Sequence, residues 1–464
     1  MSGKVPGTFP DTPAGGRSRP PRVEGQAMPA ASPSVRRPEA RRAVAHFVQA
    51  ALRELAADVA SGTEVPFALD TRGRYGGPAL YEYRPLYRAY VEARMDRLVR
   101  LPDYDTAVGS LADDPAVLGV AHDHAPEADT DEIALRSAVL VPLVVGVAEG
   151  AGGFDFDDRV FDGIFDRMLS DVAQTRRSFT GFAPVVGLRA VDGVHDLGQD
   201  IHARRISPTE LAEAWPECQG LLPERFGMAR DRLLALELDV ALPRVDDVEL
   251  PDTARRFARA ILALRIVFGG PITVGPVLFE RVDWLPRAVR ALPASVTQTL
   301  PGDPTRLDPQ RLYLVRALAD RMAEAEVHGG PVAVALGRWA AASGAAVSAE
   351  RAAGLAASVE PLLGADGAGH HAVAMRAAAL VGANAADRED IAIAMRTALG
   401  LARPDAPLTD TEALAVTVGD VARSVLAAAL DHGADASQLG AMLDAVLLGS
   451  RPRPQSVTNL VRSA

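Results

Sequence analysis

Apolar residues recur at every third or fourth position in several parts of the N-terminal region, which is the spacing of amphipathic helices. The pattern predicts helices from Ala43 to about Val59, from Glu82 to Val99 and from about Asp157 to Val172. Between the second and third of these helices, residues 112–132 turn acidic and contain prolines. This stretch therefore predicts a loop or a boundary between two parts of the region.

The middle of the chain changes to runs rich in Val, Leu and Ile, which favour β-strands. Strands are predicted at Ala138–Val147, Pro184–Val191, His195–Ile206, Leu233–Ala241 and Ala263–Val277. The second and third of these strands are expected to form a hairpin through a turn at Asp192–Gly193. A helix should begin at Ser207, whose side chain can cap it, and an arginine-rich helix is expected at Thr253–Leu264.

Strand patterns vanish from Leu307 onward, and Ala, Leu, Val and Met recur at helical spacing as far as Leu448. Gly364 and Gly382 stand where two of these helices should end, because glycine is common just after a helix C-terminus. The run Thr409–Glu412 has the composition of a capping box and predicts the start of a long helix. Short connections between the helices imply antiparallel neighbours in a single bundle.

The predicted fold class is α+β, with a mixed α/β N-terminal region followed by an all-α helical bundle. We expect a disordered arm rich in Pro and Arg over residues 1–42 and the mixed region over 43–300, with a possible sub-boundary at 112–132. The bundle is expected over residues 305–450 and a flexible tail over 451–464.

Composition bears on whether the protein is associated with a membrane and on its cellular location. The chain has 464 residues, of which 48% are hydrophobic and 23% are charged. The sequence contains no apolar run close to the roughly 20 residues that span a bilayer. No apolar segment follows the basic residues of the N-terminal arm as it would in a secretory signal. We therefore expect no membrane association and a cytoplasmic location.

Cysteine and lysine each occur once, as Cys218 and Lys4. A single cysteine excludes an internal disulfide and a multi-cysteine zinc site. A single lysine in the N-terminal arm excludes P-loop proteins, protein kinases and pyridoxal enzymes, because each needs a lysine in its active site. The net charge of -11 argues against a phosphate-binding surface spread over the whole protein. No cofactor is expected.

Three phrases occur in order in the helical half: Leu355–Leu363, Met375–Leu380 and a stretch that runs from Arg388 to Arg403. In this order and spacing they resemble the HEPN superfamily of small helical bundles, specifically its Apea-like branch. The preceding phrases at 197–210 and 264–268 also resemble the region that comes before this domain in such proteins. The resemblance covers about two thirds of the chain and implies that the C-terminal bundle is HEPN-like.

Active members of this superfamily are metal-independent ribonucleases that place an Arg and a His close together at a helix end, usually in a dimer. Arg403 falls at the motif arginine, but Leu408 stands near the position of the histidine. An imidazole moves protons near neutral pH and a guanidinium holds the scissile phosphate, so neither replaces the other. The resemblance therefore implies a degenerate catalytic motif, unless a histidine such as His370, His371 or His432 is recruited from elsewhere.

Tyrosines and arginines alternate along the helix predicted after Gly77. The candidate residues for binding nucleic acid or a ligand are Tyr83, Arg84, Tyr87, Arg88, Tyr90 and Arg94. Aromatic faces stack on bases and guanidinium groups bind phosphates, which suits single-stranded nucleic acid. The alternative is a half-buried helix whose arginines pair with acids nearby.

Three other clusters each have a simpler explanation. His122–Asp123–His124 carries metal-ligand atoms, but in an acidic stretch without a rigid frame. The aspartates of residues 155–166 alternate with phenylalanines, as on a helix with one buried and one solvated face. A basic cluster could hold an anionic partner, or pair with acids, at Arg255, Arg256, Arg259 and Arg265. No metal site is predicted.

Our leading hypothesis is a catalytically degenerate HEPN-like protein that acts by binding, as a sensor or regulator in bacterial defence or stress response. We expect a homodimer formed through the bundle and a possible RNA or protein partner. One alternative is a metal-independent endoribonuclease that uses Arg403 with a recruited histidine. The other is a helical scaffold or interaction protein unrelated to this superfamily.

Overall fold

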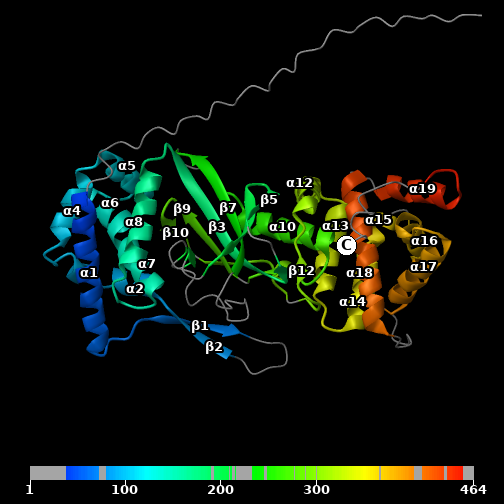
Figure 1. Cartoon of the computed structure of the whole chain (residues 1–464), viewed down its shortest axis with the longest axis horizontal. Coiled ribbons are helices and arrows are strands. Elements are labelled where there is room, and N and C mark those ends of the chain that lie inside the picture. The colour runs from blue at the N-terminus through cyan, green and yellow to red at the C-terminus, as the bar shows by residue number, and fades with distance from the viewer. Residues whose placement is uncertain are drawn as a thin grey trace, which may run out of the picture.

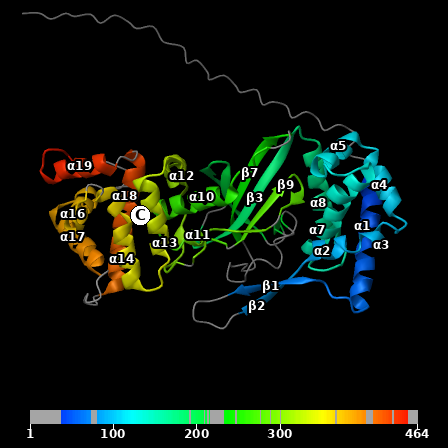
Figure 2. The ribbon, with the colours of Figure 1, turned by 180° about the vertical axis from the view of Figure 1, so that it is seen from behind.

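The computed structural model describes residues 38–72, 80–189, 193–207, 210, 211, 215, 233–244, 248–275, 277–287, 289–298, 300–364, 367–401, 410–432 and 436–452. Arg403 and Leu408 lie outside these residues, as do the arm up to residue 37 and the tail from residue 453. The fold class is α+β, as predicted. Three parts follow one another along the longest axis of the molecule: N-terminal helices, an antiparallel sheet and a C-terminal bundle (Figure 1, Figure 2).

The N-terminal helices, which we call the helical layer, pack around a core of their own. They are α1 (Pro38–Ala60), α2 (Tyr87–Glu92), α3 (Met95–Leu98), α4 (Tyr104–Ala112), α5 (Pro115–His124), α6 (Asp131–Leu135), the π-helical turn η2 (Arg136–Leu140), α7 (Val141–Ala151) and α8 (Asp158–Val172). The helices predicted over 43–59 and 157–172 are confirmed as α1 and α8. Asp157 caps α8 by accepting hydrogen bonds from the backbone N–H groups of Arg159 and Val160.

Three predictions in this region are wrong. Residues 82–85 belong to strand β2 (Leu80–Pro85), which pairs with β1 (Phe67–Arg72) in a two-stranded ribbon, so the helix begins only at Tyr87. Residues 115–124 form helix α5 rather than a loop, because Asp114 caps the helix and Pro115 starts it. The apolar run 138–147 is helical, since a segment that is buried on every side has no polar face to reveal its period.

The central sheet is antiparallel and has the strand order β10-β9-β3-β7-β6-β5. Its strands are β3 (Arg176–Val186), β5 (Val194–Gly198), β6 (Ile201–Ile206), β7 (Leu233–Pro243), β9 (Val277–Val282) and β10 (Leu285–Pro286), with β8 (Thr273–Val274) and β11 (Arg290–Ala291) paired off this path. The short strands β4 (Leu188–Arg189) and β12 (Thr305–Arg306) pair with each other in parallel. The strand predicted at 233–241 is confirmed as β7.

The predicted hairpin has a different position. Its turn connects β5 to β6 through Gln199 and Asp200, which both have positive φ angles, of 54° and 63°. Asp192 lies outside the described residues. Ser207 accepts a hydrogen bond from the backbone N–H of Glu210, as expected of a helix cap. The strand predicted over 263–277 is wrong in its first part, because α10 (Thr253–Phe268) continues to Phe268 and packs on the sheet.

The C-terminal part is a helical bundle, as the periodicity predicts. Its elements are α11 (Ala294–Thr297), η5 (Pro309–Arg311), α12 (Leu312–His328), α13 (Pro331–Ser343), α14 (Ser348–Ser358), α15 (Glu360–Leu363), α16 (His370–Val381), α17 (Ala385–Gly400), α18 (Thr411–His432) and α19 (Ala436–Leu447). Gly364 and Gly382 end α15 and α16 as predicted. At the start of α18, Asp410 accepts a hydrogen bond from the backbone N–H of Ala413, whereas Glu412 pairs with Arg351 of α14. Thr409 lies outside the described residues.

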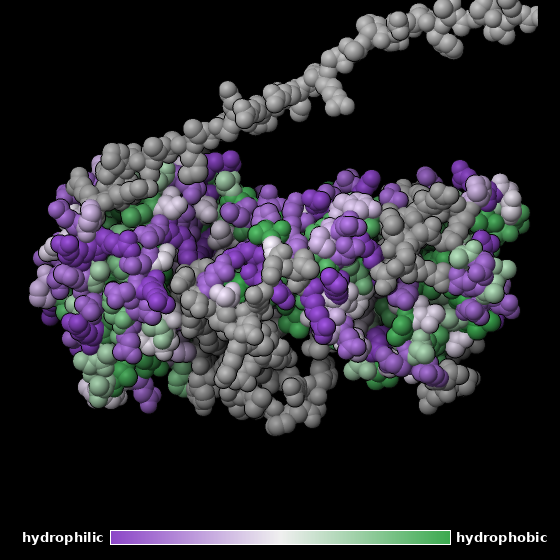
Figure 3. Space-filling view, in the orientation of Figure 1, coloured by the Kyte–Doolittle hydropathy of each residue, from purple (hydrophilic) through white to green (hydrophobic). Residues whose placement is uncertain are grey.

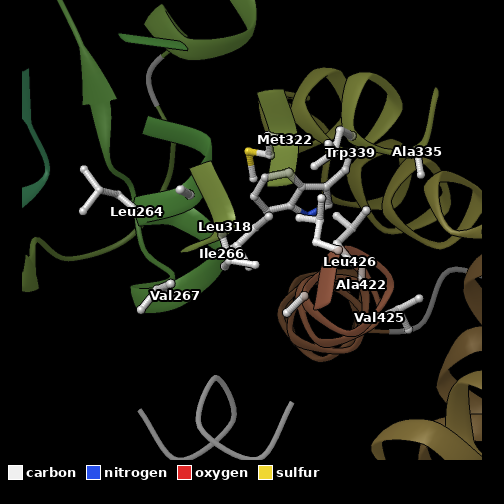
Figure 4. Packing of buried hydrophobic residues seen from close by; sticks show 14 of the residues in the cluster. Leu264, Ile266, Val267, Leu318, Met322, Ala335, Trp339, Ala422, Val425 and Leu426 are labelled. Carbon is white, nitrogen blue, oxygen red and sulfur yellow. The ribbon is translucent and has the colours of Figure 1, made fainter. Parts of the chain in front are cut away.

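One hydrophobic core joins the inner face of the sheet, α10 and the bundle. Figure 4 shows Trp339 of α13 packed among Leu318 and Met322 of α12. Ile266 of α10 and Leu426 of α18 close the same cluster. The core therefore runs through the boundary predicted near residues 300–305, while the helical layer keeps a separate core.

Two helical stretches, Asp131–Ala151 and Thr411–Asp431, are long and apolar enough to cross a membrane by length and composition. Their most apolar windows are 72% and 61% buried inside the protein. Core helices of soluble proteins pass the same test, so the two stretches are weak evidence for a membrane. On the face seen in Figure 3, hydrophobic areas are small and are separated by hydrophilic ones.

Candidate functional site

The turn between β9 and β10 inserts into the helical layer. Trp284 in this turn is 2% exposed and belongs to the core of the N-terminal helices, although the strands on either side belong to the sheet. Its indole Nε1–H donates to the carbonyl oxygen of Ala138 at 2.9 Å, within the π-helical turn η2. Such π-turns are frequent at functional sites, and the groups around this turn form the candidate site.

Asp283 precedes Trp284 and is the centre of a buried ion cluster. Its side chain is inaccessible to solvent, and its backbone is left-handed with a φ of 54°. One carboxylate oxygen accepts the backbone N–H of Ser178 at 2.8 Å. The other lies 2.8 Å from His124 Nε2 and 3.3 Å from Arg244 Nη1. With its proton on Nε2, the imidazole of His124 is held in one orientation by the carboxylate.

Arg244 follows β7 and connects the sheet to the end of helix α8. Its guanidinium donates to the carbonyl oxygens of Asp171 at 3.0 Å and Gln174 at 3.4 Å. It also lies 3.6 Å from a carboxylate oxygen of Asp123. A cation at a helix C-terminus is favourable because the last carbonyl groups carry partial negative charge. Arg244 therefore binds both the helical layer and Asp283.

Asp171 is the least satisfied acid of this cluster. It is 6% exposed, and its Oδ2 atom has no hydrogen-bond partner among the described residues. Burial, together with the negative charge of Asp283, raises the pKa of Asp171 to about 7. Arg167, Arg244 and Arg281 oppose this increase only in part. The carboxyl group can therefore gain or lose a proton near neutral pH.

The cluster combines an imidazole, a carboxylate partner, a guanidinium and a carboxyl group with a raised pKa. Such groups can store and release protons, and the carboxyl group is well placed to change the charge of the site. Across the residues that the structure describes, no group of three or more His, Cys, Asp or Glu side chains could hold a metal ion. His122 instead lies 2.9 Å from Asp131 on the surface.

Sequence reasoning found only part of this site. The sequence pattern identifies His122–Asp123–His124 as a cluster but not the partner that fixes His124, because Asp283 is 159 residues away from His124 along the chain. Asp171, Arg244 and Asp283 were not identified. Asp283 has one weak sequence signal, its place beside a tryptophan between two apolar runs, which many turns share.

The tyrosines of the predicted binding surface face the protein interior where the structure describes them. Tyr87 and Tyr90 are buried, and both rings pack against Phe154, with centroids 5.4 and 5.3 Å away. The guanidinium of Arg94 lies over the ring of Tyr90 at 3.5 Å and donates to Asp58 at 2.5 Å. These rings therefore have no face open for stacking on a base in this conformation.

The other members of the predicted surface are dispersed. Arg88 lies 3.5 Å from Glu92 on the same helix. Tyr83 and Arg84 lie in strand β2, with side chains outside the described residues. Asp58 also accepts hydrogen bonds from Tyr90 and Arg97. Hydrogen bonds from Arg94 and Arg97 lower the pKa of Asp58 well below its ordinary value. The contacts fit the alternative interpretation, a half-buried helix with paired arginines.

Three arginines of the predicted basic cluster of α10 have close internal partners, whereas the Nε atom of Arg259 lies 4.0 Å from Glu326 and has no hydrogen-bond partner among the described residues. Arg255 lies 2.5 Å from Glu326, and Arg256 lies 3.3 Å from Asp200. Arg265 is buried and donates to the backbone oxygens of the loop and helix that follow α10, which are those of Ile272, Ser295 and Val296. Burial lowers the pKa of Arg265 to about 10. These arginines hold α10 to its neighbours.

In the bundle, the predicted catalytic residue Arg403 lies outside the described residues. The buried arginines that are described contact neighbouring helices. Arg376 of α16 donates to both carboxylate oxygens of Asp444 in α19, at 2.9 and 2.7 Å. Arg351 of α14 donates to both carboxylate oxygens of Glu412, at 2.8 and 2.6 Å.

Comparisons with known proteins found no relative of this chain. No protein-family model matches the chain, and neither a curated protein nor a solved structure is significantly similar to it.

Proposed function

We propose that this protein acts by binding, as a sensor or regulator, and that its C-terminal bundle is a HEPN-like scaffold without nuclease chemistry. The motif that resembles this superfamily retains Arg403 but has Leu408 near the position of the catalytic histidine. Without an imidazole beside the arginine, RNA bound at this position lacks a group that transfers the proton of its 2'-hydroxyl.

The observation that best supports the absence of nuclease chemistry is the use of buried arginine in the described part of the bundle. Arg351 and Arg376 are buried, and each is held by a carboxylate of another helix, Glu412 or Asp444. A guanidinium held in this way stabilises helix packing and is not available to a scissile phosphate. His370 lies 3.3 Å from Glu360, which is a contact between neighbouring helices rather than with an arginine.

Charge bears on the kind of partner. Residues 303–450 contain 11 arginines and 18 acidic residues, so the helical half is negatively charged. Tight binding to RNA depends on neutralising phosphates and is disfavoured on such a surface. We therefore favour a protein partner over RNA, together with a homodimer formed through the bundle. The setting that the resemblance implies is cytoplasmic, in bacterial defence or stress response.

The test is a ribonuclease assay on the purified full chain with labelled single-stranded RNA and EDTA. We expect no cleavage by the wild type, by Arg403→Ala or by the control Arg396→Ala, which changes an exposed arginine of α17. Cleavage that persists in EDTA and disappears only in Arg403→Ala would establish the rival function, a ribonuclease with a recruited histidine. Light scattering after gel filtration tests the homodimer, for which twice the mass of the 464-residue chain is expected.

The remaining alternative is a helical scaffold unrelated to the HEPN superfamily. This alternative also predicts no cleavage of RNA, so the ribonuclease assay does not separate it from the proposal. An experimental structure that includes residues 402–409 would separate the two, because the proposal requires Arg403 at an exposed groove of the bundle.

A further inference from the structure

The contact between the helical layer and the sheet depends on few side chains. The layer and the sheet have separate hydrophobic cores, and Trp284 is the one fully buried residue of the described strands and turns of the sheet that lies in the core of the layer. Among the described residues, no helix of the layer makes more than sparse backbone contact with a strand of the sheet. Polar groups supply much of the remaining contact, through His124, Asp283 and Arg244.

Charged groups from each side of the junction lie around Asp171 and Asp283. The layer contributes His124 and Asp123 from α5 and Arg167 from α8. The sheet contributes a second acid and three arginines, which are Asp283, Arg177, Arg244 and Arg281. Asp171 Oδ2 and Arg177 Nε are both buried without a hydrogen-bond partner in the described part of the chain. The junction therefore contains unsatisfied polar atoms from both the layer and the sheet.

We propose that this junction is a proton-linked latch, in which a proton on Asp171 fastens the helical layer to the sheet and loss of that proton loosens it. The inference goes beyond the proposed function, because it concerns the N-terminal half and holds whatever the bundle binds.

The physical basis is the number of buried negative charges. When Asp171 is neutral, the negative charge of the buried Asp283 carboxylate is held by Arg244, and His124 also binds it. When Asp171 is ionised, two buried carboxylates lie close together, and the new charge also loses its hydration. Separation of the layer from the sheet returns Asp171 to water and relieves both costs.

The direction with pH follows from linkage. The pKa of Asp171 is about 7 in the docked state, and 3.8 is its ordinary value in water. The docked state therefore holds the proton more tightly, and docking is strongest at low pH. Between about pH 4 and pH 7, docking weakens by up to about tenfold per pH unit, and it becomes constant above that range.

The test is hydrogen–deuterium exchange of the full chain, followed by mass spectrometry on peptides that cover η2 and α7. Protection factors between pH 5.5 and 8.5 are corrected for the intrinsic effect of pH on exchange. We expect wild-type protection to fall by about tenfold per pH unit up to pH 7 and then to become constant. Asp171→Asn carries a neutral side chain at every pH and should show constant protection. The control Asp166→Asn, an exposed residue of the same helix, should behave as the wild type.

Two results would overturn the proposal: wild-type protection that is constant or rises with pH, and an Asp171→Asn chain that keeps the wild-type slope. If Asp171→Asn does not fold by circular dichroism, Trp284→Phe decides. This variant loses the hydrogen bond to Ala138 but keeps Asp171. We expect lower protection at each pH with an unchanged slope, and a slope of zero would refute the latch.

Discussion

The indole N–H of Trp284 donates to the carbonyl oxygen of Ala138 at 2.9 Å, although 146 residues separate the two along the chain. Trp284 lies in the turn of the β9–β10 hairpin, directly before β10, and Ala138 lies in the π-helical turn of the helical layer. The ring of His124 lies edge-on to the same indole, with centroids 5.4 Å apart. The contact between Trp284 and Ala138 therefore joins the sheet to the helical layer, which have separate hydrophobic cores.

Replacement of Trp284 with Ala is expected to destabilise the protein by about 3–5 kcal/mol, because it leaves a cavity in the core of the helical layer. Trp284→Phe keeps most of the ring volume and loses the hydrogen bond, which corresponds to about 1 kcal/mol. Urea unfolding followed by circular dichroism measures both values. Equal losses for the two variants would show that the cavity does not matter.

Asp58 should stabilise the helical layer in a pH-dependent way. Hydrogen bonds from Arg94 and Arg97 lower its pKa in the folded state from the ordinary value of 3.8. The stabilisation is therefore present above about pH 4 and is lost as pH falls below that value. Asp58→Asn should be less stable than the wild type at pH 7, with a difference that shrinks at pH 3. Urea midpoints at both pH values measure it.

The control for this prediction is Asp105→Asn, which changes an exposed carboxylate of α4. Its effect at pH 7 should remain within about 0.5 kcal/mol. An Asp58→Asn chain that is as stable as the wild type at pH 7 would contradict the prediction.

Gly187 should not tolerate a side chain. Its φ angle is +79°, and a Cβ atom at this position would lie 2.1 Å from the backbone oxygen of Pro271. Gly187→Ala is therefore expected to destabilise the protein by more than about 1 kcal/mol, since both the backbone angle and the neighbouring backbone must change. Thermal unfolding checks this value. The matched control is Gly119→Ala in α5, where a Cβ atom meets nothing within 4 Å; there a neutral or slightly stabilising effect is expected.

Arg376 should hold helix α19 to the bundle. Arg376→Met removes both hydrogen bonds to Asp444 and the bond to the carbonyl oxygen of Leu363. We expect a loss of about 1–3 kcal/mol, because hydrogen bonds to charged groups are stronger than neutral ones. Faster hydrogen exchange in α19 identifies the site of the loss. Arg396→Ala, at an exposed position, should leave α19 unchanged.

Periodicity alone determined the elements that have one apolar and one polar face. The helices around Val44–Leu55 and Leu312–Met322 were predicted because burial on one side leaves a repeat in the sequence. The run 138–147 was mistaken for a strand because it is buried on every side. Residues 263–268 were mistaken in the same way, since the C-terminal end of α10 is buried against both the sheet and the bundle.

The sequence by itself determined the α+β class and the helical C-terminal half, because these properties depend on composition and on neighbours along the chain. The tertiary structure alone decided that Tyr87 and Tyr90 are core residues and that His124 meets Asp283. Contacts between residues more than 100 positions apart depend on how the helices and the sheet pack, and local sequence patterns carry no record of that packing. The same holds for the raised pKa of Asp171, which arises from burial and from a second acid that only folding brings near.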